Sequence, residues 1–529
     1  MYDILIKNGF IIDGKRTKRY KSDLAMSDGK IQAIKKNINP AGAKRVVDAE
    51  GKIVAPGFID IHTHSDASFI VDNRSESKIY QGVTSEVVGQ CGSTFYPSNI
   101  NDLSNLRSYV KGKNIDTDYY ASTSFTEFIN KADTNDLKPA NNWLTLIGHN
   151  ALRTSVMGFE GRPATQDEIA KMKDLLEQEM KNGAWGLSLG LGYAPGIFSD
   201  INELVALGEV VAKYNGMIAS HMRDQGNRIY QALDEMFEIN RRTGAHVHIA
   251  HLKLSGVANW GKAEDLLAYI RNAQSYGVNV TCDIYPYEAA SSGITNTLPK
   301  WTLAGGVEAA AKRFKTDERN KIIKELEEKY PDKEAGDRIY IVSTDGLYPE
   351  ADDKTIGELA EELDISVAEA IEKVVVETNG HCRQISFAMD ENDMLRFIKE
   401  IDISIGSDGS GLPLDSKLNQ GKPHPRNFGT FPRFLRLNRE HNMMPLEDAI
   451  YKMTGNSAKI MGIKDRGTLE IGQSADITIF DEEKISDKAT YKNPFQKPVG
   501  IDCVIINGET VVLNGEQTKE RPGKFLLNK

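Results

Sequence analysis

Cysteine is scarce in this chain, with four residues among 529, widely scattered and never in a CxxC spacing. Such usage argues against a disulfide framework and predicts reduced thiols and a cytoplasmic location. No stretch approaches the roughly 18 to 20 apolar residues that a membrane span requires. The opening "MYDILIKNGFIIDGK" has no basic segment leading into an apolar one, so we expect a strand, a turn and a strand there and not a signal peptide.

Positive charge is not in excess either. The formal net charge of −10 and the pI near 5.6 argue against nucleic acid or an anionic membrane as the main partner, because both attract basic surfaces. Short repeats and low-complexity tracts are lacking as well. Hydrophobic residues make up 40% of the chain and charged ones 26%, which is ordinary for a globular protein. Since the length exceeds what one core usually holds, we expect two or more domains.

What the chain does contain is a rhythm of short apolar runs that end in polar residues, each followed by a helical segment. The runs are "IVAPGFIDIHTH", "GVTSEVVGQCG", "WLTLIGHN", "WGLSLGLGY", "GMIASHMRD", "HVHIAHLK", "VNVTCDIYPY" and "DISIGSDG". Segments such as "TQDEIAKMKDLLEQEMKNG" between them have apolar residues at helical spacing and a closing glycine. Eight strand-then-helix units predict an α/β fold of the (β/α)8 barrel type.

Two further parts are expected around this barrel of residues 56–463. The gap between the seventh and eighth runs is too long for one crossover, so we predict an inserted subdomain over about residues 288–345, with a charged helix and the β-like run "DRIYIVST". Whether it is a functional lid or an incidental elaboration stays open. Residues 1–55 and 464–529 are both β-rich with turn signals, and together they predict one small β-domain.

Polar side chains collect where the predicted strands end, which is where catalytic groups project in such barrels. His62 and His64 are two apart, so in a strand both imidazoles face the same way. The full set at these ends is His62, His64, Cys91, His149, His221, His251 and Asp408. Thiolate and imidazole suit Zn²⁺. Each residue alone also has a structural explanation, such as a buried cysteine, a core histidine or an Asp-Gly turn.

Several of these segments together resemble a known family. "PGFIDIHTHSD" is similar to the HxH signature of the first strand in the amidohydrolase superfamily. The ordered set "GVTSEVVGQCGS", "GHNALR", "SLGLGYAPG", "SHMRD", "AHLK", "YPYEAASSG", "GSDG" and "HPRNFGTFPRFL" resembles the N-acyl-D-amino-acid deacylase (D-aminoacylase) family. The resemblance spans about residues 53–460, and the chain ends resemble the family's split β-domain. It implies an amidohydrolase-type TIM barrel with a small β-sandwich built from both ends.

The resemblance also implies a site and a reaction. It assigns one tight zinc to Cys91, His221 and His251, and a second, weaker metal position to His62 and His64 together with Asp408. The implied activity is zinc-dependent hydrolysis of N-acyl-D-amino acids to a carboxylate and a free D-amino acid. A metal-activated water would be the nucleophile, and Asp408 would take up its proton and later pass it to the leaving amine. The preference for the D configuration comes wholly from the resemblance.

An N-acyl amino acid carries an α-carboxylate, which needs a cation or several donors. By resemblance the candidates are Arg426, Lys253, Tyr193 and Tyr287, and the planar guanidinium fits a carboxylate best. His149 would either help to polarise the amide carbonyl or brace the end of its strand, and the two remain open. The segment "SSGITNTLPKW" resembles the stretch that meets the substrate's side chain, and its lack of arginine weakly disfavours an acidic D-amino acid, although Lys300 stands nearby.

Three alternatives remain at this point. The nearest is a cyclic amidohydrolase that acts on hydantoins or dihydropyrimidines, although the fourth run, "WGLSLGLGY", lacks the lysine that many two-metal members carboxylate. A hydrolase of D-aminoacyl peptides would use the same chemistry. A non-catalytic scaffold of the same fold would typically have lost metal ligands, whereas all the expected ones are present here. The sequence does not predict the oligomeric state.

Overall fold

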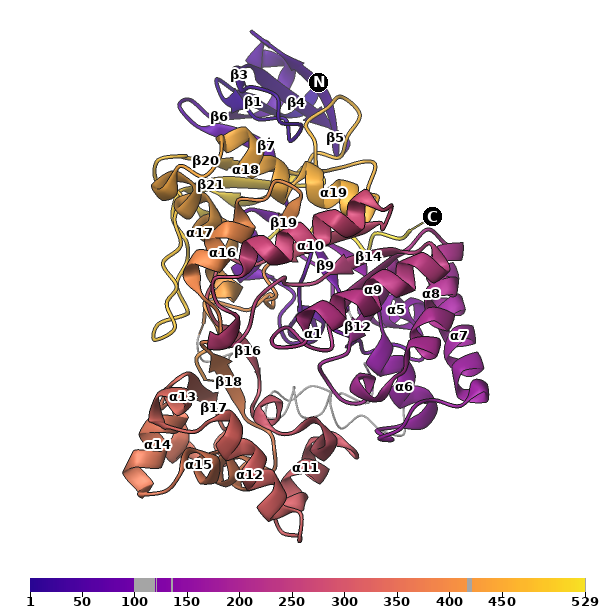
Figure 1. The fold of residues 1–529 in the computed structure, drawn as a ribbon. Coiled ribbons are helices and arrows are strands. Elements are labelled where there is room, and N and C mark those ends of the chain that lie inside the picture. The colour runs from indigo at the N-terminus through magenta and orange to yellow at the C-terminus, as the bar shows by residue number, and fades with distance from the viewer. Residues whose placement is uncertain (99–118, 120, 135–136, 416–420, 529) are drawn as a thin grey trace.

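The computed structural model describes residues 1–98, 119, 121–134, 137–415 and 421–528 of the chain. In Figure 1 the N-terminal strands, in indigo, lie at the top beside strands from the C-terminal part, and a group of helices from the second half of the chain lies at the bottom. The strands and helices between these two parts form the central body. No helix among the described residues combines the length and the apolar character needed to cross a bilayer.

The central body contains eight parallel strands. The third consists of two segments, β10 and β11, that are interrupted only at Leu146 and pair with β9 on one side and β12 on the other. The bounds are β8 (Phe58–Asp60), β9 (Val83–Val88), β10 (Asn142–Thr145), β11 (Ile147–Gly148), β12 (Gly186–Gly190), β13 (Met217–His221), β14 (His246–Ile249), β15 (Val280–Ile284) and β19 (Ile403–Ile405). Each strand overlaps one of the eight predicted runs, so the predicted strand count is confirmed.

The first and eighth strands close this sheet into a barrel. Thr63 and Gly409 form a parallel bridge just beyond β8 and β19. The Asp408 N–H donates to the His62 carbonyl at 2.9 Å, and the His64 N–H donates to the Gly409 carbonyl at 2.9 Å. Because all strands of a closed parallel barrel end at one face, side chains that follow distant strands meet there.

Helices follow the strands as the sequence predicts. The expected helix after the third strand is α7 (Gln166–Lys181), which begins at a capping box formed by Thr165 and Glu168. The other helices of the body are α1 (Asp66–Val71), α2 (Glu76–Ile79), α5 (Phe125–Thr134), α6 (His149–Met157), α8 (Ile201–Lys213), α9 (Ile229–Thr243), α10 (Ala263–Ser275), α16 (Glu391–Ile398), α17 (Arg426–His441), α18 (Leu446–Met453) and α19 (Gly455–Met461). Apolar residues of these helices share one buried core with the barrel strands, except those of α19, where Ile460 and Met461 pack in a separate cluster with Val87 and Met217 of the barrel.

Both chain ends build a β-sandwich, as the resemblance implies. One sheet has the order β5-β4-β1-β6, and the other has the order β23-β22-β21-β20-β7-β2-β3. The bounds are β1 (Tyr2–Lys7), β2 (Phe10–Ile11), β3 (Tyr20–Lys21), β4 (Asp23–Ser27), β5 (Lys30–Lys35), β6 (Ala43–Asp48), β7 (Ile53–Pro56), β20 (Ile477–Phe480), β21 (Ile501–Ile506), β22 (Glu509–Leu513) and β23 (Glu516–Gln517). Ile6 and Met26 of the first sheet share a buried cluster with Val54 and Ile479 of the second. We propose that residues 1–55 and 464–529 form this domain.

The segment between β15 and β19 carries its own sheet and core. The antiparallel strands β16 (Ala290–Gly293), β18 (Arg383–Ser386) and β17 (Ile339–Ser343) lie in that order. The helices are α11 (Val307–Arg313), α12 (Arg319–Lys329), α13 (Lys333–Asp337), α14 (Ile356–Leu363) and α15 (Val367–Glu377). β18 separates the other two strands, so the sheet is not complete by residue 345, where the sequence suggests that the insertion ends. We propose instead that the inserted subdomain runs from about residue 288 to Ser386.

Candidate metal centre

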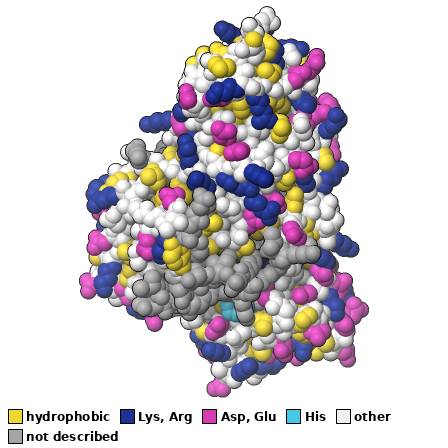
Figure 2. Space-filling model, turned by 180° about the vertical axis from the view of Figure 1, so that it is seen from behind, with side chains coloured by type: hydrophobic (Ala, Val, Ile, Leu, Met, Phe, Trp, Pro, Cys, Tyr) yellow, Lys and Arg dark blue, Asp and Glu magenta, His cyan; other side chains and the backbone are white. Residues whose placement is uncertain are grey.

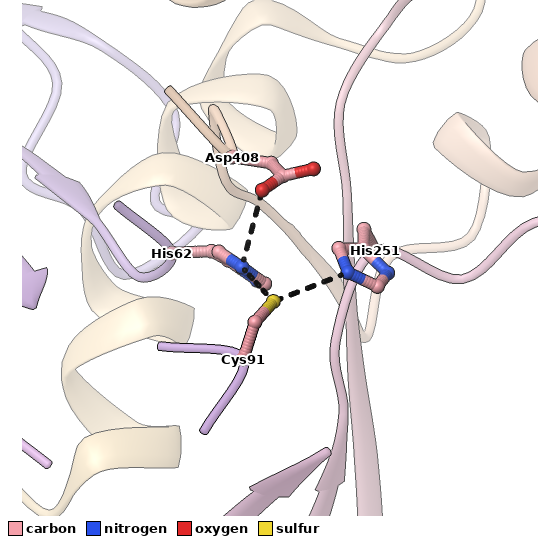
Figure 3. A group of neighbouring side chains, drawn as sticks. All are labelled: His62, Cys91, His251 and Asp408. Carbon is pink, nitrogen blue, oxygen red and sulfur yellow. Dashed lines mark hydrogen bonds and ion pairs between the residues drawn. The ribbon is translucent and has the colours of Figure 1, made fainter. Parts of the chain in front are cut away.

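Four side chains from different strands converge at the carboxyl end of the barrel (Figure 3). His62 follows β8, Cys91 follows β9, His251 follows β14 and Asp408 follows β19. Their ligand atoms all lie within 4.8 Å of one another, and all four side chains are buried. A thiol, two imidazoles and a carboxylate at such distances form a group that can hold a metal ion.

The thiol of Cys91 lies at the centre of this group. Its Sγ is 3.4 Å from Nε2 of His62, 3.5 Å from Nε2 of His251 and 3.8 Å from Nδ1 of His221. His221 ends β13, and its Nδ1 is 2.9 Å from Nε2 of His251. The thiol of Cys91 and the imidazoles of His221 and His251, which the resemblance assigns to the tight zinc, therefore lie close enough together to share one ion.

Asp408 borders the group on its other side. Its Oδ1 lies 3.0 Å from Nε2 of His64 and 3.5 Å from Nε2 of His62, and its Oδ2 lies 2.8 Å from Nη1 of Arg426. The side chain of His64 is 32% exposed, whereas that of His62 is fully buried. The carboxylate thus lies between the histidines of the group and the guanidinium of Arg426.

The backbone at three of these residues is in the left-handed region. The φ angles are +53° at Cys91, +37° at His251 and +50° at Asp408, although none of these residues is glycine. Non-glycine residues rarely adopt such angles, and they do so mainly where the surrounding structure holds them. Next to Cys91, a Cβ on Gly92 would lie 2.7 Å from the backbone nitrogen of Gly190, so only glycine allows this close approach.

The electrostatic surroundings of Cys91, His221 and His251 favour the forms of these side chains that bind metal. Burial raises the pKa of Cys91, but His62 and His251 outweigh it and hold that pKa well below its ordinary value. Burial also lowers the pKa of His221 to about 3, so its imidazole is neutral at pH 7. Metal binding requires a thiolate and neutral imidazoles, and Cys91, His221 and His251 favour these forms before any ion arrives. At His62, Asp283 and Cys91 outweigh the effect of burial and raise the pKa well above its ordinary value, so an ion that binds there must displace a proton.

Other side chains predicted to contact the substrate surround the same face. Nζ of Lys253 donates to the hydroxyl oxygen of Tyr285 at 3.2 Å, and the guanidinium of Arg426 lies 5.0 Å from the centre of the Tyr285 ring. The ring of Tyr193 packs against His221 at a centroid distance of 4.5 Å. Lys253, Arg426 and Tyr193 therefore lie close to the metal ligands.

Tyr287 and His149 make other contacts. The Tyr287 hydroxyl donates to the Pro425 carbonyl at 3.4 Å, and the guanidinium of Arg433 lies 4.5 Å from the centre of its ring. Nε2 of His149 lies 2.6 Å from Oε1 of Glu203, and both side chains are fully buried. These contacts favour the second of the two roles considered for His149, that of bracing the strand end. Its role in the reaction stays a prediction.

Two residues of the seventh run were not singled out from the sequence. Asp283 is fully buried and contacts two of the histidines, and Tyr285 lies between Lys253 and Arg426. The signal that could have found them is the alternation of "CDIYPY", in which these two residues share one face of the strand. Gln225, which follows the fifth run, was also not singled out. Its Nε2 lies 3.0 Å from Nδ1 of His251, and nothing in the sequence pattern indicates it.

Lys300 of the inserted subdomain reaches the edge of this group. Its Nζ donates to the Gly192 carbonyl at 3.0 Å. A Cβ on Gly192 would lie 2.8 Å from Nε2 of His221, so Gly192 itself lies against that ligand. Lys300 therefore lies close to the site, and the substrate preference that the segment "SSGITNTLPKW" indicates stays a prediction.

The fourth strand contributes no lysine to the centre. Ser188 of this strand accepts a hydrogen bond from the Gly92 N–H at 3.0 Å and donates one to the Gly89 carbonyl. The fourth strand thereby holds the loop that carries Cys91.

Comparison with known proteins supports the family resemblance that the sequence motifs indicate. Residues 45–512 match a family described as "Amidohydrolase family". A D-aminoacylase of Alcaligenes xylosoxydans xylosoxydans is 33% identical over 99% of this chain and 97% of its own length. An N-acyl-D-glutamate deacylase of the same organism is 32% identical over 99% of this chain and 96% of its own length.

A solved structure is also similar to this chain over its full length. The N-acyl-D-glutamate deacylase of Bordetella bronchiseptica, in complex with zinc and a phosphonate inhibitor that mimics the tetrahedral intermediate, has a TM-score of 0.84 to this chain. The two are 30% identical, and the similarity covers 99% of each chain. The barrel, the β-sandwich of the chain ends and the insertion are therefore all within the region of similarity.

Proposed function

The chain belongs to the amidohydrolase family, and from that premise we propose that it hydrolyses the amide bond of N-acyl-D-amino acids with a bound zinc ion. The products are a carboxylate and a free D-amino acid. The observation that carries the proposal is that Cys91, His221 and His251 lie around one point at the carboxyl end of the barrel. The full-length relatives act on this class of substrate, and one of them contains zinc in its structure.

The donor set fits zinc. Cys91, His221 and His251 would hold the tightly bound ion, because zinc accepts thiolate and imidazole ligands and tolerates three of them with one position open. His62, His64 and Asp408 would line a second, weaker position beside it. When bound, zinc supplies a Lewis acid that activates water and polarises a carbonyl oxygen.

Asp408 would move the protons of the reaction. Burial raises its pKa, but Arg426 and His251 outweigh that effect and hold the pKa well below its ordinary value, so the carboxylate is ionised at pH 7. An ionised carboxylate at the carboxyl end of the barrel can accept a proton from the attacking water and pass it to the leaving amine. A backbone in the left-handed region and a contact with His64 hold its oxygens toward the cluster.

The α-carboxylate of the substrate would bind to Arg426, Lys253 and Tyr285. These groups offer a planar guanidinium, an ammonium and a hydroxyl within one region of the site. In this proposal Tyr285 takes the role for which the resemblance makes Tyr287 a candidate. Asp408 already pairs with Arg426, so a substrate carboxylate that takes over this arginine would raise the pKa of Asp408 and make it a stronger base.

A substrate panel tests the proposal. Purified, zinc-loaded protein is expected to release free amine from N-acetyl-D-methionine and to leave N-acetyl-L-methionine and hydantoin unchanged. N-acetyl-D-glutamate belongs in the same panel because Lys300 donates a hydrogen bond to Gly192, which lies against His221, and a D-aminoacyl dipeptide tests the closest variant of the chemistry. Turnover of hydantoin without turnover of any N-acetyl-D-amino acid would favour a cyclic amidohydrolase. No turnover of any compound by protein that holds zinc would favour a scaffold.

Replacement of Arg426 with lysine is expected to raise KM for N-acetyl-D-methionine about 10- to 100-fold, because a charge-assisted hydrogen bond contributes about 1.5 to 3 kcal/mol. A lysine keeps the charge but loses the planar fork that fits a carboxylate. KM for N-acetyl-D-methioninamide, which lacks the carboxylate, should change little. Steady-state kinetics on both substrates makes the comparison.

Arg436→Lys is the matched control, because Arg436 lies on the same helix and pairs with Asp487 through its Nε at 2.8 Å. It should leave both KM values unchanged. An equal loss on the acid and the amide in Arg426→Lys would mean that Arg426 does not recognise the carboxylate.

Location and partners are proposed on weaker grounds. All four cysteines are free thiols in the structure, which supports a reducing, cytoplasmic location. Acidic and basic side chains are interspersed on the face drawn in Figure 2, and the net charge is −10. We therefore propose that the partner is the small-molecule substrate and not nucleic acid or membrane.

A further inference from the structure

One buried carboxylate contacts two of the candidate ligands at once. Asp283 lies in β15, and its side chain is fully buried. Its Oδ2 is 3.2 Å from Nδ1 of His62 and 2.9 Å from Nε2 of His248. Its Oδ1 accepts a hydrogen bond from the backbone N–H of His251 at 2.8 Å. Asp283 therefore connects the strand ends that carry two different ligands.

These contacts determine which nitrogen of His62 carries a proton. An ionised carboxylate only accepts hydrogen bonds, so the Nδ1 of His62 that faces it must be an N–H donor. In the neutral ring, Nε2 is then the nitrogen with a free lone pair. Nε2 is the atom that faces Sγ of Cys91 at 3.4 Å and Oδ1 of Asp408 at 3.5 Å. The hydrogen bond to Asp283 thus presents the correct nitrogen of His62 to the metal centre.

The second contact holds a backbone that is otherwise unfavourable. His251 has a φ of +37°, in the region that residues with a Cβ rarely adopt. Its N–H is bound by Oδ1 of Asp283, and the N–H of the next residue, Leu252, donates to the Asp283 carbonyl at 2.8 Å. Both hydrogen bonds support the turn that aims the imidazole of His251 at the thiol of Cys91.

A series of side-chain hydrogen bonds continues from Asp283 through His248 and Thr281 to His246. Nδ1 of His248 lies 2.8 Å from Oγ1 of Thr281, and Nε2 of His246 lies 2.8 Å from the same hydroxyl oxygen. Nε2 of His248 donates to the carboxylate, so its Nδ1 accepts the Thr281 hydroxyl proton, and the Thr281 oxygen accepts from His246. The hydrogen bonds that link Asp283, His248, Thr281 and His246 are all compatible with one assignment of protons, in which every donor has an acceptor.

From these contacts we infer that Asp283 is a positioning residue of the metal centre, which sets the tautomer of His62 and the turn at His251. This inference rests on the zinc site proposed above. Three N–H groups point at the carboxylate, from His62, His248 and His251. In Asp283→Asn one oxygen becomes an NH₂ group, which cannot accept, so at least one donor would face another donor.

Measurement of zinc affinity in Asp283→Asn tests the inference. The Kd for zinc, measured by competition with a chromophoric chelator, is expected to rise about 10- to 100-fold, the usual cost of losing an outer partner of a metal ligand. The visible spectrum of the Co²⁺-substituted protein should change as well, because the ligand geometry changes. Thr281→Val is the matched control: it removes the hydroxyl next along the chain but leaves the contacts of Asp283 with His62 and His251 intact.

The outcomes separate this inference from the proposed function. If the wild-type protein binds no zinc, the proposed function fails. If the wild type binds zinc and Asp283→Asn binds it equally tightly with the same Co²⁺ spectrum, only the positioning role is wrong. Equal losses of affinity in Asp283→Asn and Thr281→Val would also overturn it, because a general loss of core packing would then explain both.

A second measurement does not depend on whether Asp283→Asn folds. In the zinc-loaded wild-type protein labelled with ¹⁵N-histidine, His62 is expected to be the tautomer protonated at Nδ1. Its signals are identified by their absence in His62→Gln. A His62 ring that is protonated at Nε2 and bare at Nδ1 would contradict the inference, since that nitrogen could not donate to Asp283.

Discussion

Asparagine in place of Asp408 is expected to lower kcat for N-acetyl-D-methionine by about 10²- to 10⁴-fold, the range that a positioned general base contributes. Asparagine has the same shape but cannot accept a proton at pH 7. The thiol of Cys91 and the imidazoles of His221 and His251 remain in place, so the tightly bound zinc should be retained. Turnover and zinc content measured on the same sample distinguish a lost base from a lost metal.

Asp476→Asn is the matched control for this change. Asp476 is 4% exposed and Asp408 is 6% exposed, and each pairs with an arginine, Arg466 and Arg426 respectively. Asp476 lies in the β-sandwich of the chain ends, so its replacement should reduce stability without reducing kcat. If Asp408→Asn keeps turnover close to that of the wild type while zinc is bound, Asp408 does not transfer the proton.

Cys91→Ala is expected to lose both the bound zinc and the activity. Removal of a ligand should weaken zinc binding by more than the about 100-fold that the loss of an outer partner can cost. Zinc that binds only the folded state contributes about 4 kcal/mol of stability at a free concentration 1,000 times its Kd. The Tm of the wild-type protein should therefore rise when zinc is added after chelation, and the Tm of the variant should stay unchanged.

Cys282→Ala serves as the control for Cys91→Ala. Cys282 is 3% exposed and lies in β15, and burial raises its pKa, so its thiol stays protonated and inert. Its loss should lower Tm and leave the zinc stoichiometry intact. Full zinc content and normal turnover in Cys91→Ala would rule out the thiolate as a ligand and with it the proposed tight site.

Much of the fold and of the site could be read from local patterns. A strand alternates its side chains, so the spacing of His62 and His64 already places both on one face. Apolar runs with polar ends mark the strands and their carboxyl ends, and their number indicates the barrel. Cys91, His221, His251 and Asp408 follow from that pattern because each lies at or just past the end of a strand. The substrate class came from the resemblance, since periodicity carries no information on chirality.

Local patterns failed where the chain leaves a regular element. Tyr285 and Tyr287 are two apart and look equivalent in a strand, but β15 ends at Ile284. The N–H of Tyr287 donates to the Tyr285 carbonyl at 3.0 Å, which marks a tight turn and sends the two rings to different neighbours. The end of the insertion is hard to predict for a similar reason, because the order of β16, β18 and β17 depends on pairings between distant segments.

The kinds of residue at the centre, and the ends of the strands that carry them, are properties of short segments and need no knowledge of the rest of the chain. How these residues come together depends on the tertiary structure. Closure of β19 onto β8 brings Asp408 into contact with His62, which lies 346 positions earlier in the sequence. The role of Asp283 is of this second kind. Nothing in its own segment shows that it holds His62 and His251, since hydrogen-bond partners across a barrel depend on the register of strands that only folding brings together.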